Sequence, residues 1–166
     1  MVLKMGEVAE LLTTTCGMPE REVRGYSIDS RTLEPGQLFF ALRGPRFDGH
    51  QFVSQAIERG AAGAVVEQGF HPQVTPDLAS LLLPVADTLR ALQSLARAVR
   101  GQWGGRLIAV TGSTGKSTTK EMIASILSRR LTVHKSPGNL NNDYGLPLAL
   151  LALEPRHDVA VVELAM

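Results

Sequence analysis

The spacing of apolar side chains in the first hundred residues switches several times between that of a helix and that of a strand. Met5, Val8, Leu11 and Leu12 recur at the spacing of one helix face, and the polar residues after them end that helix. The later periodicity predicts strands near 26–30, 37–42, 64–67 and 81–85, helices near 52–57 and 87–100, and a proline-rich surface loop over 68–80. This mixture indicates a small α/β domain.

The rest of the chain alternates regularly between strand and helix. The pattern predicts strands over 106–111, 132–135 and 158–163, with helices over 117–130 and 146–153. Such alternation implies parallel strands joined by right-handed crossovers. We therefore expect an α/β fold with an N-terminal domain over 1–84, a linker helix over 85–105 and the first part of a parallel-sheet domain over 106–166.

Composition narrows the possible partners and compartments. The 166 residues carry a formal net charge of +1 and no basic cluster, so nothing predicts a nucleic-acid partner. The longest apolar runs, such as Leu81–Ala86, are far shorter than the roughly 20 residues that span a bilayer, so we expect no membrane insertion. Cys16 is the single cysteine, which excludes a disulfide framework and a thiolate metal cluster and suits the cytoplasm.

A glycine-rich loop follows the first strand of the second domain and opens a helix. Its residues are Gly112, Ser113, Thr114, Gly115, Lys116, Ser117 and Thr118. Glycines let backbone N–H groups turn toward phosphate oxygens, and a helix N-terminus adds partial positive charge. Lys116 would act on the β- and γ-phosphates, and the Ser117 hydroxyl would ligate Mg²⁺. Chance produces such a pattern in roughly 1% of chains of this length, and the strand–loop–helix context makes chance rarer still.

The loop departs from the usual phosphate-binding pattern at one position. Val110 stands six residues before Lys116, where that pattern has its first glycine. The sequence therefore predicts a shorter phosphate-binding loop than that of a generic nucleoside triphosphatase.

Glu163 is the second candidate for catalysis and metal binding. It ends an apolar strand and should emerge at the carboxyl edge of the sheet, where open α/β sheets bind ligands. A carboxylate there can hold Mg²⁺ beside phosphates. The alternative is a strand-end glutamate that faces solvent.

Polar loops next to predicted strands supply the candidate substrate contacts. Asn141 and Asn142 lie in an asparagine-rich loop that either binds substrate or only makes turns. In the first half, 27–31 and 46–50 either cradle a ligand or are solvated loops. Three histidines, His71, His134 and His157, lack metal-ligand spacing and are interpreted as structural.

Two stretches resemble the Mur ligases of peptidoglycan synthesis. The N-terminal, uridine-nucleotide-binding domain of that family is similar to SIDSRTLEPGQLFFALRGPRFDGHQFVSQAIERGAAGAVVE, and its central ATPase domain is similar to TGSTGKSTTKEM. The combination GSTGKSTTKEM with GNLNNDYGLPLALL is most similar to the family member that adds D-alanyl-D-alanine. The resemblance extends over nearly the whole chain.

The resemblance implies the roles of the candidate residues. Ser30 and Arg31 would lie near the UDP-sugar, with Asp48, His50, Asn141 and Asn142 as further substrate contacts. Lys116 and Glu163 would be catalytic, with ATP on the loop and Mg²⁺ on Ser117 and Glu163. The implied substrates are UDP-N-acetylmuramoyl tripeptide and D-alanyl-D-alanine, joined through an acyl phosphate with release of ADP and phosphate.

The chain departs from the family's pattern because it stops just after a core strand. The family's later central-domain segments and its C-terminal domain are absent, so we expect a fragment that does not ligate by itself. Two alternatives stay open: a UDP-sugar and nucleotide-binding module without turnover, and the family member that adds the third peptide residue.

Overall fold

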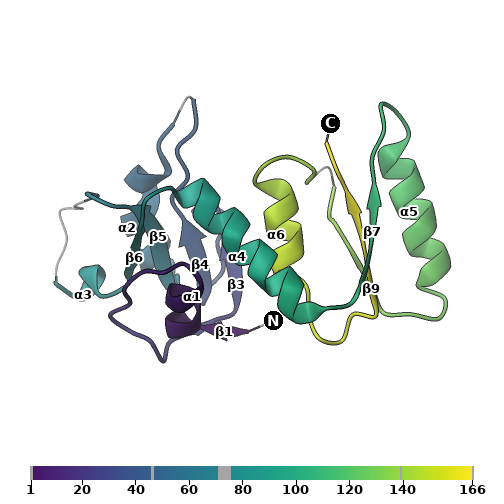
Figure 1. Cartoon of the computed structure of the whole chain (residues 1–166). Coiled ribbons are helices and arrows are strands. Elements are labelled where there is room, and N and C mark those ends of the chain that lie inside the picture. Colours follow the sequence, from purple (N-terminus) through teal and green to yellow (C-terminus); the bar gives the residue numbers. More distant parts are fainter. Residues whose placement is uncertain (1, 46, 71–75, 139, 166) are drawn as a thin grey trace. The chain divides into compact units, whose positions relative to one another are not determined.

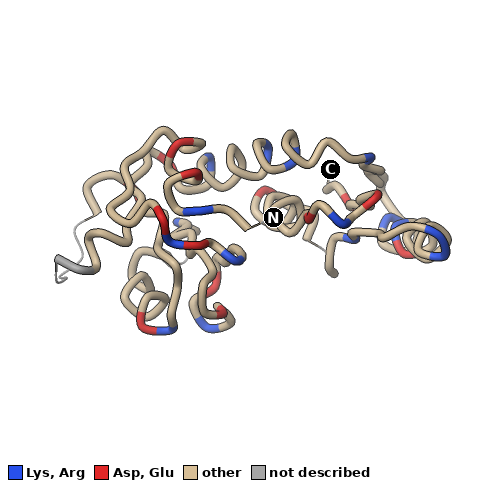
Figure 2. Tube along the Cα trace, turned by 90° about the horizontal axis from the view of Figure 1, so that it is seen from below, with Lys and Arg blue, Asp and Glu red and all other residues tan. Residues whose placement is uncertain are grey.

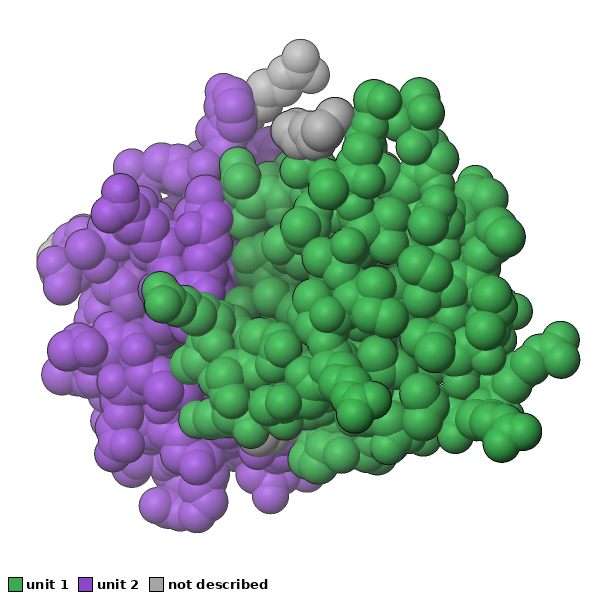
Figure 3. Space-filling model, turned by 45° about the vertical axis from the view of Figure 1, so that its right-hand side comes forward, with its two compact units in different colours: residues 1, 96–166 green, residues 2–95 purple. Residues whose placement is uncertain are grey.

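The computed structural model describes residues 2–45, 47–70, 76–138 and 140–165. The chain forms two compact units, which we name by their order in the sequence: the first unit, Val2–Leu95 (purple in Figure 3), and the second unit, from Ala96 onward (green in Figure 3). The division falls inside helix α4 (Thr88–Trp103), for which Asp87 supplies the cap by accepting a hydrogen bond from the Arg90 N–H. Lysine and arginine are interspersed with aspartate and glutamate in both units (Figure 2).

The first unit is built on a sheet of four parallel strands in the order β3-β4-β5-β6. These strands are β3 (Gly25–Ser27), β4 (Gln37–Phe40), β5 (Gly63–Glu67) and β6 (Leu82–Val85). A two-stranded antiparallel pair, β1 (Leu3–Lys4) and β2 (Glu22–Val23), completes the strands described in this unit. Its remaining helices are α1 (Met5–Leu11), the 3₁₀ helix η1 (Gly49–Phe52), α2 (Val53–Glu58) and α3 (Pro76–Ala79).

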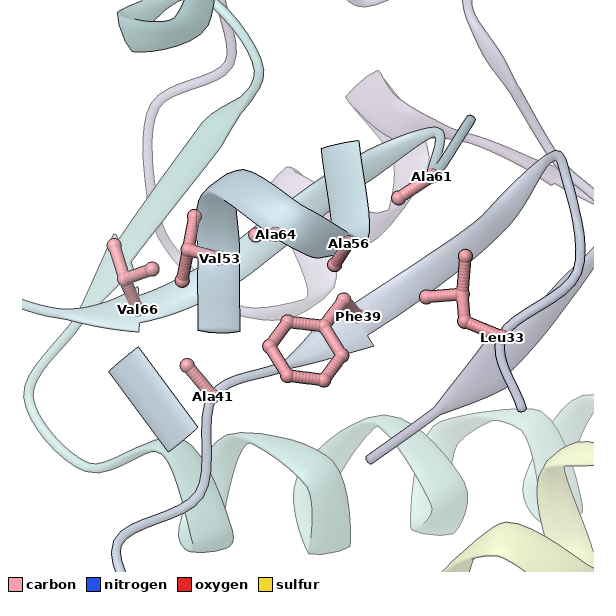
Figure 4. Packing of buried hydrophobic residues seen from close by; sticks show 8 residues of the cluster. All are labelled: Leu33, Phe39, Ala41, Val53, Ala56, Ala61, Ala64 and Val66. Carbon is pink, nitrogen blue, oxygen red and sulfur yellow. The ribbon is translucent and has the colours of Figure 1, made fainter. Parts of the chain in front are cut away.

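One hydrophobic cluster of the first unit lies between α2 and the strands β4 and β5 (Figure 4). Phe39 of β4 is the largest of its buried side chains and is 1% exposed. Around it pack smaller apolar residues: Leu33, Ala41, Val53, Ala56, Ala61, Ala64 and Val66. Burial of this face fixes α2 on the sheet, and α2 in turn anchors the loops described below.

The second unit contains a parallel sheet in the order β7-β9-β8, formed by β7 (Arg106–Val110), β9 (Val159–Glu163) and β8 (Val133–Lys135). Helices α5 (Lys116–Leu127) and α6 (Gly145–Leu151) lie on opposite sides of it (Figure 1). Val133 packs on the α5 side, whereas the next residue, His134, hydrogen-bonds Ala149 of α6. Side chains alternate along a strand, so β8 contributes to both faces.

Most predicted elements are present within a few residues of their expected bounds, with three exceptions. The strand expected over 26–30 ends at Ser27, because the Ser27 hydroxyl accepts the Asp29 N–H and turns the chain. A short helix, α3, lies in the expected loop 68–80, of which 71–75, and with them His71, are outside the described residues. Strands β1 and β2 were missed because two residues leave no periodicity.

Across the ranges that the structure describes, no helix is both long enough and apolar enough to cross a membrane.

Candidate functional site

The loop between β7 and α5 has the backbone that anion binding requires. Gly112 and Gly115 have φ values of +138° and +74°, in the region that glycine tolerates and other residues avoid. Helix α5 begins directly after Gly115, so the N–H groups of its first turn have no partner one turn earlier. The Lys116 Nζ lies 2.7 Å from the Gly112 carbonyl oxygen and donates to it across the loop. The loop and the start of α5 therefore combine N–H donors that have no helical partner with the cation of Lys116.

Val110 shows why this loop is shorter than the usual one. It is the last residue of β7, is 8% exposed and packs with Ala124 of α5 and Val161 of β9. The position that is glycine in a longer loop is here part of the hydrophobic core. Of the remaining loop residues, Ser113, Thr114, Ser117 and Thr118 are exposed.

Glu163 lies beside this loop and is not a solvent-facing strand end. It pairs in register with Val110 and is 3% exposed. The Ser117 hydroxyl donates to Glu163 Oε2 over 2.8 Å, and the Asn141 Nδ2 donates to Oε1 over 2.9 Å. Three segments thus meet at one carboxylate: the start of α5, the loop after β8 and the end of β9.

The surroundings of Glu163 favour its charged form. The Ser117 hydrogen bond, opposed by burial and assisted by Asn141 and by the charges of Lys120 and Lys116, holds the Glu163 pKa below its ordinary value. Glu163 is therefore an anion at neutral pH. It can accept hydrogen bonds or bind a cation, but it has no proton to give.

Ser117 and Glu163 are the oxygen groups beside the loop that could hold a magnesium ion, because the separation of their hydrogen-bonded oxygens also suits two neighbouring ligands. Mg²⁺ binds oxygen ligands at 2.0–2.1 Å in an octahedron, so neighbouring ligand oxygens stand about 2.9 Å apart. The Ser117 hydroxyl and Glu163 Oε2 are 2.8 Å apart. In the described part of the chain no group of three or more histidine, cysteine, aspartate or glutamate residues could hold a metal ion. Water and phosphate oxygens would complete the coordination, as is usual for Mg²⁺.

The two candidate asparagines have different structural roles. Asn141 faces Glu163, and its backbone carbonyl accepts the Ala165 N–H. Asn142 instead stabilises the turn into α6, because its side-chain oxygen accepts the Gly145 N–H over 2.8 Å. A Cβ on Gly145 would lie 2.8 Å from the Leu140 Cα, so this close approach of two backbone segments requires glycine. Asn139, in the same loop, is outside the described residues.

Ser30 and Arg31 follow β3 at the carboxyl edge of the first sheet. The Ser30 hydroxyl is buried and donates to the Gln55 side chain of α2 over 2.7 Å. The Arg31 side chain is 82% exposed and makes two hydrogen bonds to Asp29. Those bonds to Arg31 lower the pKa of Asp29 to about 2. Of the two candidates, only the Arg31 guanidinium is open to a ligand.

Asp48 and His50 stabilise the loop that precedes α2. Asp48 accepts the His50 backbone N–H at the start of η1 and also the ring Nδ1–H over 2.6 Å. His50 Nε2 accepts the Glu67 N–H at the end of β5 over 2.9 Å, which fixes the Nδ1–H tautomer. Burial raises the pKa of Asp48, but its His50 bonds and Arg43 outweigh this and hold it below the ordinary value. Both ring nitrogens of His50 are engaged within the protein, and Arg46 is outside the described residues.

Two other histidines have structural partners, as expected. His134 is buried and bonds the Ala149 carbonyl oxygen through Nε2, and His157 Nδ1 accepts the Glu154 N–H. Burial lowers the pKa of both rings.

Lys120 is the one residue of this site to which the motif analysis gave no role. It is 1% exposed and lies four residues after Lys116, on the same side of α5. The sequence did contain a signal for it. Lys120 lies on the same helix face as Ile123, Ala124 and Leu127, and a lysine on an apolar face indicates a buried partner for its charge.

Comparison with known proteins finds a different family model for each half of the chain. The model of the Mur ligase family, catalytic domain, matches residues 22–100, and that of the Mur ligase middle domain matches residues 110–166. A UDP-N-acetylmuramoyl-tripeptide–D-alanyl-D-alanine ligase of Bacillus subtilis is 44% identical over 162 residues, which are 96% of this chain and 35% of the relative. The chain thus spans about a third of the length of the curated relatives it matches.

Solved structures give the same result. A crystal structure of MurF from Acinetobacter baumannii matches 100% of the chain and 36% of its own length, with a TM-score of 0.87 and 37% identity. MurF ligase from Thermotoga maritima in complex with ADP matches 85% of the chain and 32% of its own length, with a TM-score of 0.71 and 35% identity. The chain belongs to the Mur ligase family.

Proposed function

We propose that this chain supplies the UDP-substrate part and the first nucleotide-binding part of an ATP-dependent ligase that joins D-alanyl-D-alanine to UDP-N-acetylmuramoyl tripeptide. The observation that carries the proposal is the hydrogen bond from Ser117, at the start of α5, to the buried carboxylate of Glu163. The names of the relatives give the two substrates. The 35–38% identity to the MurF structures favours this reaction over addition of the third residue.

In this proposal each residue of the site has one task. The N–H groups of the loop and of the first turn of α5 hold the β- and γ-phosphates, and Lys116 exchanges its contact with Gly112 for a phosphate oxygen. Ser117 and Glu163 would hold Mg²⁺, which when bound neutralises charge on the phosphates. Asn141 keeps the Glu163 carboxylate oriented.

The proposed reaction has two steps. The terminal carboxylate of the muramoyl tripeptide attacks the γ-phosphorus of ATP and releases ADP, which gives an acyl phosphate. The amine of D-alanyl-D-alanine then attacks the acyl carbon, and phosphate leaves as the amide forms. The loop donors and Lys116 stabilise charge on the transferring phosphoryl group in the first step.

We propose domain limits that follow the sequence: residues 1–84 for the UDP-substrate, 85–105 as a linker and 106–166 for the nucleotide. Arg31 would contact the UDP-sugar directly. Ser30, Asp48 and His50 would shape the loops around it through α2 and β5, and Asn142 would position the loop after β8. A cytoplasmic location stays a prediction.

A ligase assay tests the proposed reaction. We expect the full-length protein that contains this chain to release ADP only when UDP-N-acetylmuramoyl tripeptide, D-alanyl-D-alanine and Mg²⁺ are all present, at about 1 to 10³ per second. Residues 1–166 alone should release none. Turnover with the UDP-linked dipeptide and a free diamino acid, and none with D-alanyl-D-alanine, would instead show the enzyme that adds the third residue.

A binding experiment tests the first unit. Arg31→Gln in residues 1–166 should weaken the binding of UDP-N-acetylmuramoyl tripeptide roughly tenfold or more in titration calorimetry, because charge-assisted hydrogen bonds contribute about 1.5–3 kcal/mol. The control is Arg24→Gln. Arg24 is exposed and pairs with Glu22 two residues away, just as Arg31 pairs with Asp29. Equal losses in both variants, or no heat with the wild-type chain, would refute this assignment.

A further inference from the structure

Lys120 is a cation enclosed by the second unit. Its Nζ donates to the carbonyl oxygens of Ser136, over 2.9 Å, and of Gly138, over 2.7 Å. It lies 3.9 Å from Glu163 Oε2 and 3.8 Å from Oε1 of the half-exposed Glu121, and the side chains of Lys120 and Glu163 are 1% and 3% exposed. An ammonium group has three donors, and two of them are used on the loop after β8. The contact with Glu163 is too long for a hydrogen bond and is purely ionic.

The two carbonyls that Lys120 holds belong to the loop that carries Asn141. Ser136 also ties this loop to β9, since its N–H donates to the Val161 carbonyl and its hydroxyl accepts the Glu163 N–H over 3.3 Å. Lys120 itself stands one turn after Ser117 on α5. It therefore connects the three segments that meet at the Glu163 carboxylate.

We propose that Lys120 is a positioning residue for the magnesium site, which fixes the loop after β8 so that Asn141 holds Glu163 in its ligating orientation beside Ser117. This inference rests on the proposed nucleotide and metal site. A buried ammonium is costly unless its donors are satisfied and an anion is near, and both conditions are met here. Lys116 contacts the nucleotide in this scheme, whereas Lys120 acts only through the loop and Glu163.

Nucleotide binding with and without metal separates these roles. In residues 1–166, Lys120→Met should weaken the binding of ADP in excess Mg²⁺ at least tenfold. It should change the binding of ADP in EDTA less than twofold, because the glycine loop and Lys116 remain. Lys120→Arg keeps the charge and the donors, and it should retain the effect of Mg²⁺ on ADP binding within about threefold. Titration calorimetry with ADP as the probe measures the affinities of the wild type and of both variants, each in Mg²⁺ and in EDTA.

Lys135→Met is the matched control. Lys135 ends β8 close to the same loop, but its side chain is 41% exposed and pairs with Glu121 rather than with Glu163. Because Glu121 also lies 3.8 Å from the Lys120 Nζ, this variant additionally tests whether the Glu121 charge matters to the site. The same substitution there should change neither affinity. Equal weakening with and without Mg²⁺ in Lys120→Met would show that Lys120 merely supports α5, and unchanged affinities would show that it does nothing for the site. Either result overturns the proposal.

A measurement without nucleotide distinguishes failure of this inference from failure of the proposed function. Lys120→Met should speed hydrogen exchange of the Ser136 and Leu140 amides at least tenfold and leave the amides of β5 unchanged. If Glu163→Gln binds ADP with the same Mg²⁺ dependence as wild type, the proposed metal site is wrong whatever Lys120 does. If Glu163→Gln loses that dependence while Lys120→Met keeps it and the loop amides stay protected, only the Lys120 proposal fails.

Discussion

Replacing Lys116 by alanine should weaken ATP binding roughly ten- to a hundred-fold at every magnesium concentration. The ammonium group lies at the glycine loop, 2.7 Å from the Gly112 carbonyl oxygen, and would bind phosphate directly. Charge-assisted hydrogen bonds of this kind contribute about 1.5–3 kcal/mol net, and each 1.4 kcal/mol is a factor of ten in affinity. In the full-length ligase the same change should also slow phosphoryl transfer. The measurement is ATP affinity as a function of magnesium concentration.

Glu163→Gln is the informative comparison for Lys116→Ala. Glutamine keeps the shape of the side chain but removes the charge that would hold Mg²⁺ beside Ser117. Its defect should therefore appear mainly as a need for more magnesium, and high magnesium should partly restore binding and activity. The alanine variant should gain nothing from added magnesium. A glutamine variant that follows the wild-type curve throughout would contradict the metal assignment.

The fold was largely predictable because its signals are local. The apolar run Val159–Val162 is typical of a strand covered on both faces, and every residue of β9 is buried in the structure. The helix expected over 87–100 begins where Asp87 accepts the Arg90 N–H, which is a local signal of the same kind. Sequence periodicity does not report where a single hydroxyl turns the chain, so the end of β3 at Ser27 was placed wrongly.

The candidate site also has a part that the sequence predicted and a part that it did not. The glycine loop lies within seven consecutive residues, and the reasons for its residue types are all in its own backbone, so the sequence was sufficient to predict it. The Lys120 contacts join positions sixteen and eighteen residues apart, and no local pattern encodes them. Sequence reasoning also could not separate Asn141, which faces Glu163, from Asn142, which stabilises the turn into α6, because neighbouring asparagines differ only in where the loop directs them.

The largest expected effect on stability is that of Phe39→Ala in the first unit. Phe39 is 1% exposed and lies at the centre of the cluster between α2 and the strands β4 and β5 (Figure 4). Truncation of a buried phenylalanine costs about 3–5 kcal/mol, because transfer free energy is lost and a cavity remains. Domains of this size are stable by only about 5–15 kcal/mol, so a large part of the free energy of unfolding of this unit would disappear.

Phe47→Ala is the control, since Phe47 is 65% exposed and the same change there should cost about 0.5 kcal/mol or less. Thermal and urea unfolding of both variants measure the difference. Because Ser30 bonds Gln55 of α2 and Asp48 caps the 3₁₀ helix η1 that leads into α2, loss of this core should also release the loops proposed to bind the UDP-sugar. Phe39→Ala should therefore lower the affinity for UDP-N-acetylmuramoyl tripeptide although residue 39 contacts no ligand in the proposal. Unfolding midpoints that agree between the two variants would show that this cluster does not hold the first unit together.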